Sequence, residues 1–260
     1  MTAATIRMTR DDKRHPMPAF DYSQIYDVYD SYVRYDGDVP FFVRASQLAR
    51  GEVLELMAGT GRISQPLVNA GISLTCLEYD HGMASVLARK VPRARVVCAD
   101  VLAMPFRRRF HTILLPFQGL SELATREERA RLMHEAAALL EEGKTFFCTA
   151  HNPRVRARTL DGSWQNVGTF GNVEVRIRGT VSGDLVEGEQ HIVVRGDGGA
   201  IERDHHLPLR FSLPPFEEIK ALGEDAGLRL QFVAGDYHGS LYEETTSPVI
   251  VAMFTPATRQ

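Results

Sequence analysis

Acidic and glycine residues spaced for nucleotide chemistry stand in the stretch Glu52-Val-Leu-Glu-Leu-Met-Ala-Gly-Thr-Gly-Arg-Ile-Ser64. Glu55 lies in an apolar run that predicts a buried parallel strand, and Gly59 and Gly61 allow a tight turn that a ligand can approach closely. A helix is predicted from Arg62 onward, with its free N–H groups facing the turn. A carboxylate in this turn suits the amino group of a cationic ligand better than a pyrophosphate.

Two further acids end later apolar runs. Residues 72–78 predict a second strand ending at Glu78, and Val96 to Leu102 predict a third strand that delivers Asp100. Doubly wound folds place an acid roughly 20 residues after the glycine turn to bind ribose hydroxyls, which is the role predicted for Glu78. The alternative is a solvated acid at a strand end. Three acid-tipped strands in order favour a nucleotide site over a purely structural glycine turn.

The residues Glu-Leu-Met-Ala-Gly-Thr-Gly-Arg at 55–62 resemble motif I of the class I S-adenosylmethionine-dependent methyltransferases, written E/D-x-x-x-G-x-G. The motif departs from many members at Met57-Ala58. The resemblance implies S-adenosyl-L-methionine as the cofactor, with Asp100 accepting a hydrogen bond from the adenine amino group. The implied cofactor-binding residues are Tyr26, Glu55, Met57, Ala58, Gly59, Gly61, Arg62, Glu78, Tyr79, Met83, Asp100, Val101 and Pro116.

The predicted catalytic residues surround the exit of a fourth apolar strand, His111 to Phe117. The phenyl ring of Phe117 is expected beside the transferable methyl group, and Glu122 or His151 is expected to accept a proton. In similar amino-sugar methyltransferases a histidine follows this strand, and Glu122 stands at the matching position, so the identity of the base stays open. The structural alternatives are a core role for Phe117, a helix-capping or helix-preceding role for Glu122 and a non-catalytic role for His151.

An aromatic stripe precedes the glycine turn. Tyr22, Tyr26, Tyr29 and Tyr32 recur at helical spacing, which predicts a helix packed on a core. The resemblance offers a second interpretation, because small-molecule methyltransferases often carry Y-x-x-x-Y-D-x-x-Y in a helix that folds over the cofactor. Tyr22 is then expected to complete the catalytic set from the opposite side.

Strands and helices alternate as far as Ala150, which predicts an α/β fold with a Rossmann-like, doubly wound, mostly parallel seven-stranded sheet. Gly143 is expected to end the helix that begins at Arg126. Between Trp164 and Leu213 alternating segments predict an inserted antiparallel β meander. The predicted organisation is a flexible tail (1–20), N-terminal helices and cofactor-binding core (21–163), an inserted lid or oligomerisation subdomain (164–213), and a closing helix and strands (214–260).

The length, charge and cysteine content of the chain argue against several classes of function. A chain of 260 residues with 44% hydrophobic content can bury a large core, and a net charge of −3 gives no footprint for nucleic acid. With no apolar run of membrane-spanning length and no secretory segment, a cytoplasmic protein is expected. Cys76, Cys98 and Cys148 fall in predicted core strands without a metal-ligand spacing, so reduced cysteines and no metal site are predicted.

The meander followed by Leu-Arg-Phe-Ser-Leu-Pro-Pro-Phe at 209–216 is similar to sugar N-methyltransferases and glycine N-methyltransferase-like enzymes. This similarity implies methyl transfer to a nitrogen or oxygen of a small molecule in antibiotic or secondary-metabolite tailoring. Alternatives are O-methylation of a small phenol or carboxylate, a protein or nucleic-acid methyltransferase, an NAD-dependent enzyme, and a non-catalytic nucleotide-binding regulator. The expected partners are a small-molecule acceptor and, because the apolar meander needs a covering surface, further copies of the chain.

Overall fold

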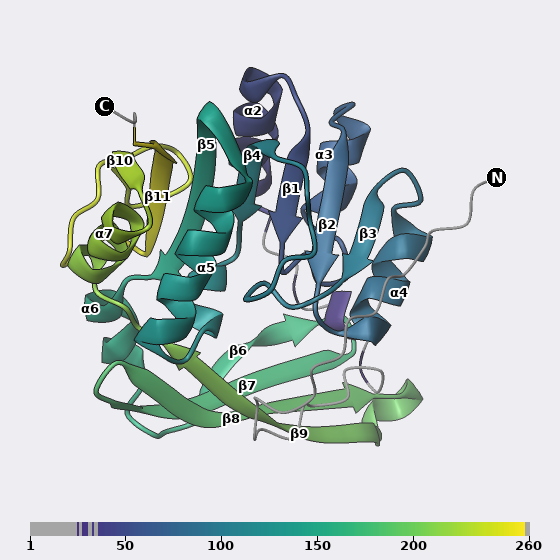
Figure 1. Ribbon diagram of the computed structural model, residues 1–260. Helices are drawn as coiled ribbons and strands as arrows, with labels where there is room; N and C mark the ends of the chain where they lie inside the picture. The colour runs from purple at the N-terminus through teal and green to yellow at the C-terminus, as the bar shows by residue number, and fades with distance from the viewer. Residues whose placement is uncertain (1–24, 26–27, 31–32, 34–35, 258–260) are drawn as a thin grey trace.

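The computed structural model describes residues 25, 28–30, 33 and 36–257, which form two β-sheets with helices around the larger one (Figure 1). The larger sheet has the order β10-β11-β5-β4-β1-β2-β3, and only β11 runs antiparallel to its neighbours. This confirms the predicted mostly parallel seven-stranded sheet. Its strands are β1 (Val53–Leu56), β2 (Leu74–Glu78), β3 (Arg95–Cys98), β4 (Phe110–Leu115), β5 (Leu140–His151), β10 (Leu228–Ala234) and β11 (Val249–Pro256).

Helices cover both faces of this sheet. The apolar residues of α2 (Val39–Ala49), α3 (Ser64–Asn69) and α4 (His81–Lys90) pack in one core cluster. Those of α5 (Arg126–Leu139) and α7 (Phe216–Asp225) pack in another. All four residues of β1 are buried, which is the reason that its sequence is a continuous apolar run interrupted only by Glu55. The sheet order changes direction between β1 and β4, the place where ligands bind in open α/β sheets.

The inserted sheet contains four antiparallel strands, β6 (Gln165–Phe170), β7 (Val173–Ser182), β8 (Leu185–Arg195) and β9 (Ile201–Ser212). Figure 1 shows this sheet lying across the edge where the parallel strands of the core end. Ile25 and Val28 of the N-terminal segment pack in one cluster with apolar side chains of β7, β8 and β9. The apolar face of the meander is therefore covered from within the chain, so its burial does not require a second copy.

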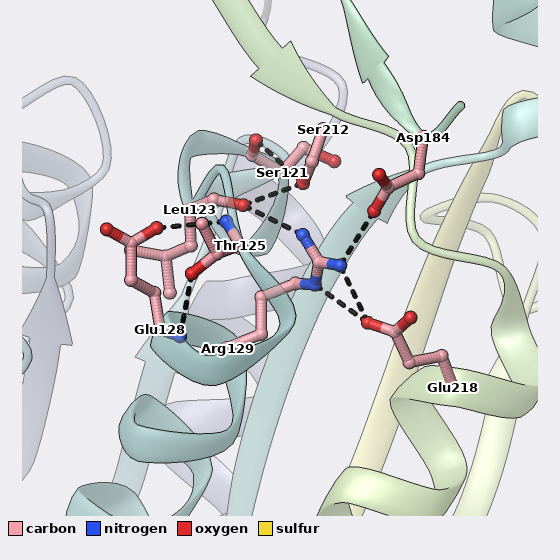
Figure 2. A network of polar contacts seen from close by, with 8 residues as sticks. All are labelled: Ser121, Leu123, Thr125, Glu128, Arg129, Asp184, Ser212 and Glu218. Atoms are coloured by element: carbon pink, nitrogen blue, oxygen red, sulfur yellow. Dashed lines mark hydrogen bonds and ion pairs between the residues drawn. The ribbon is translucent and has the colours of Figure 1, made fainter. Parts of the chain in front are cut away.

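A buried arginine attaches the inserted sheet to the core (Figure 2). The Arg129 side chain on α5 is 1% exposed, and its guanidinium donates to Glu218 of α7 at 2.8 Å and to Asp184 of the β7–β8 turn at 2.8 Å. A third hydrogen bond reaches the Leu123 carbonyl oxygen at 3.0 Å. The Ser212 hydroxyl at the end of β9 donates to the same carbonyl at 2.8 Å. One cation thus ties α5, α7 and the insert together.

Some predicted boundaries and environments differ from the structure. Helix α5 ends at Leu139 and β5 begins at Leu140, so Gly143, with φ 69°, lies inside the strand and does not end the helix. Cys98 lies on the edge strand β3 and is only partly buried, whereas Cys76 and Cys148 are buried; all three thiols are free. Within the described part of the chain, no helix is long and apolar enough to cross a membrane.

Four short helices complete the described structure: α6 (Pro153–Arg156), η2 (Gly119–Glu122), η3 (Ala157–Thr159) and η4 (Asp197–Gly199). Of these, η2 and α6 follow β4 and β5 directly. The predicted tail 1–20 and the tyrosines at 22, 26 and 32 lie outside the described residues.

Candidate active site

The loop between β1 and α3 contains two glycines, one with free space beside its backbone and one packed closely against a neighbouring helix. Gly59 has φ 57°, and among the described residues a Cβ added there would meet nothing nearer than the Met83 Sδ at 4.0 Å. Gly61 has φ 92°, and a Cβ there would lie 2.5 Å from the Leu87 Cδ1. Gly61 is therefore required for packing against α4, while Gly59 exposes backbone on the side where a ligand can approach.

The Glu55 carboxylate does not face this open side. It is 1% exposed, and its Oε2 accepts a hydrogen bond from the Ser64 hydroxyl at 2.6 Å. Because side chains alternate along β1, Glu55 shares the face of Val53 that the helices cover. Burial raises its pKa to about 7. In this geometry Glu55 ties β1 to the start of α3, and its direct contact with a cationic ligand stays a prediction.

Glu78 joins the glycine loop to the next helix. Its Oε2 accepts from the Gly59 N–H at 2.7 Å and its Oε1 from the Asp80 N–H at 2.9 Å. Burial raises the pKa of this carboxyl, which is 7% exposed. Asp80 caps α4, accepting from the Met83 N–H at 2.7 Å.

Asp100 lies two residues beyond β3, and its Oδ1 accepts from the Leu102 N–H at 2.8 Å. Of the other predicted cofactor residues, Tyr79 is 61% exposed, whereas Ala58, Met83, Val101 and Pro116 are buried. Glu78 and Asp100 therefore follow neighbouring strands at the edge where Gly59 is open, as the sequence predicted.

The exit of β4 is backbone-strained. Phe117 and Gln118 have φ 52° and 55°, a left-handed conformation that costs non-glycine residues about 1–3 kcal/mol each. The Thr149 hydroxyl accepts from the Gln118 N–H at 2.8 Å, and the Gln118 amide donates to the Tyr237 hydroxyl at 3.2 Å. Such strain persists where surrounding contacts fix it, and it concentrates at functional sites. The Phe117 side chain is 41% exposed, so it is not a core residue.

Arg62 connects the glycine loop to Phe117. Its guanidinium donates to both Asp38 carboxylate oxygens, at 2.6 and 2.7 Å, and lies 4.7 Å from the centroid of the Phe117 ring. The Asp38 side chain is fully buried. This bidentate pair fixes the plane of the guanidinium between the cofactor loop and the strained strand exit.

A cavity of about 510 Å³ borders Phe117. It lies at the ends of β4, β5 and β11 and is lined by Phe117, Gln118, His151, Arg156, Asp236, Tyr237, His238, Pro248 and Val249. A second hollow of about 430 Å³ lies near Gly51 and Gly71 and holds none of the predicted site residues. The first cavity is the one that adjoins the chemistry-bearing groups, and it brings Phe117 and His151 together.

The two predicted proton acceptors have different environments. Burial, and secondarily the nearby Arg156, lower the pKa of His151 to about 3, so its imidazole is neutral at physiological pH. The Glu122 side chain is accessible to solvent, yet it is surrounded closely enough by protein that desolvation raises its pKa to about 7. Glu122 does not line the cavity and does not cap α5, because the Thr125 hydroxyl accepts from the Glu128 N–H there.

Arg156 was not anticipated from the sequence. Its Nε is buried and has no hydrogen-bond partner in the part of the chain that the structure describes, and burial lowers the pKa of its guanidinium. Its remaining contacts are the Thr159 hydroxyl at 3.3 Å and the Phe211 ring at 5.5 Å. The cavity wall therefore carries a cation that no described carboxylate neutralises. Tyr237, in the loop after β10, was also not anticipated. Neither Arg156 nor Tyr237 lies in a segment with a long hydrophobic repeat, so the sequence pattern does not single them out.

Known proteins resemble this chain in sequence over part of its length and in structure over most of it. Residues 53–143 match the family model of a methyltransferase domain. A stretch of 54 residues is 37% identical to demethylmenaquinone methyltransferase from Renibacterium salmoninarum, covering 21% of this chain and 23% of that protein. The match thus spans less than a quarter of the curated relative.

Solved structures match over nearly the full chain. The CcbJ methyltransferase from Streptomyces caelestis has a TM-score of 0.79 at 21% identity, over 91% of this chain and 96% of that one. CalS10 from Micromonospora echinaspora, an amino pentose methyltransferase of calicheamicin biosynthesis solved with S-adenosylmethionine bound, has a TM-score of 0.70 at 19% identity, over 92% and 99%. At these identities the likeness shows the shared fold alone.

Proposed function

We propose that this chain, whose residues 53–143 form a methyltransferase domain, transfers a methyl group from S-adenosylmethionine to an amine nitrogen of a small molecule. The observation that carries the proposal is the continuity of the site. The open backbone at Gly59 leads through Arg62 to Phe117, and the acceptor-sized cavity begins at that ring. Ligands of two kinds can therefore meet at Phe117.

Residues of the glycine loop and of the ends of β2 and β3 would hold the cofactor. The space above Gly59 admits it, and Glu78 and Asp100 supply carboxylates for hydroxyl and amino groups. The bound cofactor supplies an electrophilic methyl on a sulfonium. The protein then has to align the acceptor lone pair and exclude water, which is catalysis by proximity and orientation. Tyr22 and Tyr26 stay predicted contributors that lie outside the described residues.

Nitrogen is the favoured acceptor atom because a neutral amine can attack without prior loss of a proton. Neutral His151 provides an uncharged hydrogen-bond acceptor in the cavity, and Glu122 provides a carboxyl that titrates near pH 7. The likeness to an amino pentose methyltransferase of calicheamicin biosynthesis supports an amine of a natural-product-like molecule. An oxygen acceptor, such as a phenol or carboxylate, is the alternative. Arg156 suits an anionic group elsewhere on the acceptor.

Cofactor binding is tested by calorimetry with S-adenosylhomocysteine on Gly59→Val. The new side chain should fill the open space and weaken binding by more than about tenfold. Gly143→Val is the matched control, because Gly143 is also left-handed, with φ 69° and open space, but lies near the start of β5. It should bind as the parent does. Equal binding by Gly59→Val and the parent, or tighter binding of NAD or ATP than of S-adenosylhomocysteine, would refute the site assignment.

Acceptor class and proton transfer need a second experiment. Transfer of labelled methyl should occur to small amines and not to bulk RNA or unfolded protein, and the reverse result would overturn the proposal. Glu122→Gln and His151→Asn are then compared in single turnover across pH, because loss of a proton acceptor costs about 10²–10⁴-fold in rate. If neither variant loses more than about tenfold, no side-chain base operates and positioning alone accounts for the rate.

A further inference from the structure

Metal-ligating side chains gather on the exposed face of the inserted sheet. His191 of β8 and His206 of β9 are directly opposed across the two strands, and their imidazole rings stack with centroids 4.2 Å apart. Asp204 precedes His206 by two residues and so lies on the same face. Among the described residues, one ligand atom from each of these three side chains lies within 4.8 Å of the others. The full set has no short sequence spacing, because strand pairing brings His191 of β8 to Asp204 and His206 of β9.

We propose that His191, Asp204 and His206 bind a divalent transition-metal ion. The Asp204 Oδ1 lies 2.6 Å from the His191 Nε2 and 3.6 Å from the His206 Nε2, so the three donors converge on one point of the surface. In the ion-free protein the contact between His191 and Asp204 is a hydrogen bond in which the imidazole donates. The ion takes the place of that proton, which leaves to solvent.

A carboxylate behind His206 completes the arrangement. The His206 Nδ1 contacts the Glu189 Oε1, and because a carboxylate can only accept, Nδ1 carries the hydrogen and Nε2 keeps its lone pair for the ion. Glu189 is held in turn by the Arg178 guanidinium, at 3.0 and 2.6 Å. Histidine ligands in metal sites are oriented in this way by an outer carboxylate.

The donor set selects the class of ion. Two imidazoles and one carboxylate suit Zn²⁺, Ni²⁺ or Cu²⁺, whereas Mg²⁺ and Ca²⁺ prefer sites built entirely from oxygen. Asp204 and His206 are about half exposed, which leaves room for water at the remaining positions. An ion held here joins β8 to β9 and stiffens the sheet that covers the core.

The chain carries its own reporter for this site. Trp164 is the sole tryptophan of the sequence, and its ring centroid lies 5.8 Å from that of His191 and 6.5 Å from that of His206. Titration of the full chain, free of any affinity tag, with Ni²⁺ or Cu²⁺ should quench Trp164 fluorescence saturably with one equivalent. A large excess of Zn²⁺, which binds such sites more weakly than Cu²⁺, should then restore the fluorescence by competing for the site.

Variants distinguish a built site from casual surface binding. His191→Asn and His206→Asn should abolish saturable quenching, and Glu189→Gln should weaken it about tenfold. His134→Asn, an exposed histidine on α5, is the control and should titrate as the parent does. Circular dichroism without metal should show that each variant is folded. Absence of saturable quenching in the parent, or equal affinity of His191→Asn and His134→Asn in folded proteins, would overturn the proposal.

Discussion

The inserted sheet and the N-terminal segment are each attached to the core by polar contacts, and the two sets of contacts differ in how they are built. At the insert, the 1% exposed Arg129 side chain bonds to α7, to the β7–β8 turn and to a backbone carbonyl. At the glycine loop, the N-terminal segment is held by separate polar pairs, from Asp38 to Arg62 and from Asp30 to Thr60 and Lys90. Because exposed pairs stabilise little and buried ones are costly to break, we expect the exposed Asp30 contacts to open at a lower free-energy cost than the buried pairs of Arg129 and Asp38.

The largest effect is expected at the insert junction. Arg129→Met should lower the free energy of unfolding by about 3–5 kcal/mol, because Glu218 and the Leu123 carbonyl lose a buried partner. Urea denaturation measures this change. Arg131→Met is the control on an exposed position of the same helix and should change stability by less than about 0.5 kcal/mol. Equal stabilities of the two variants would show that the insert is not fixed through Arg129.

A smaller effect is expected where the N-terminal segment meets Arg62. Asp38→Asn keeps the shape of the side chain but removes the charge of a fully buried, bidentate acceptor, which should cost about 2 kcal/mol of stability. It should also weaken S-adenosylhomocysteine binding in calorimetry, because the Arg62 guanidinium loses its fixed orientation over Phe117. The exposed Asp36→Asn is the matched control. Unchanged affinity in Asp38→Asn would separate this contact from cofactor binding.

The same contrast explains what the sequence could and could not predict. The strands were predictable because each contains an apolar or alternating segment, and several end at a local signal, such as the Gly59 turn after β1 or the Asp80 cap after β2. The inserted meander was predictable from alternation, which does not fix the ends of its strands; β7, for example, runs from Val173 to Ser182. The prediction that Gly143 ends the helix was wrong, because a glycine with positive φ can occur inside a strand as well as at a helix end.

The site was only half predictable, for a physical reason. The open glycine and the acids after β2 and β3 follow from strand order, which sequence reveals. The direction of the Glu55 side chain depends on which face α3 covers, and Arg156 and Tyr237 enter the cavity through tertiary contacts of aperiodic segments. Asp38 is likewise recognisable only once Arg62 is seen beside it. Contacts made between distant segments leave no local pattern.

The third prediction concerns how the free energy of unfolding depends on pH through one acid near each attachment. Glu55 lies beneath the glycine loop, where burial raises its pKa to about 7. Glu122 lies at the insert junction, where its side chain is accessible to solvent but desolvation by the surrounding protein raises its pKa to about 7. Since the folded pKa is above the unfolded value, the stabilisation is complete below about pH 4.5 and is lost as pH rises through 7. Stability should therefore fall from pH 6 to pH 8, by about 1 kcal/mol for the fully buried Glu55.

Urea denaturation at both pH values checks this dependence. Glu55→Gln and Glu122→Gln should each reduce the difference between pH 6 and pH 8. His151→Asn should instead enlarge it, because the pKa of His151 is lowered to about 3 in the folded protein, whereas the unfolded imidazole binds protons near pH 6, so this residue adds stability as pH rises and partly offsets the fall. A difference that persists undiminished in both glutamine variants would contradict the raised pKa values.

The smallest effect is expected at the outermost pair. Lys90 and Asp30 are 36% and 38% exposed, so Asp30→Asn should cost less than about 1 kcal/mol of stability, and a double-mutant cycle with Lys90→Met should give a coupling of similar size. Asp30 also accepts a hydrogen bond from the Thr60 hydroxyl of the glycine loop. The Asp30→Asn substitution should weaken this hydrogen bond and let the N-terminal segment separate from the glycine loop more often. The dissociation rate of S-adenosylhomocysteine in stopped flow should then rise more than unfolding does. If stability and dissociation change in proportion instead, the N-terminal contact is as much a part of the global fold as Arg129.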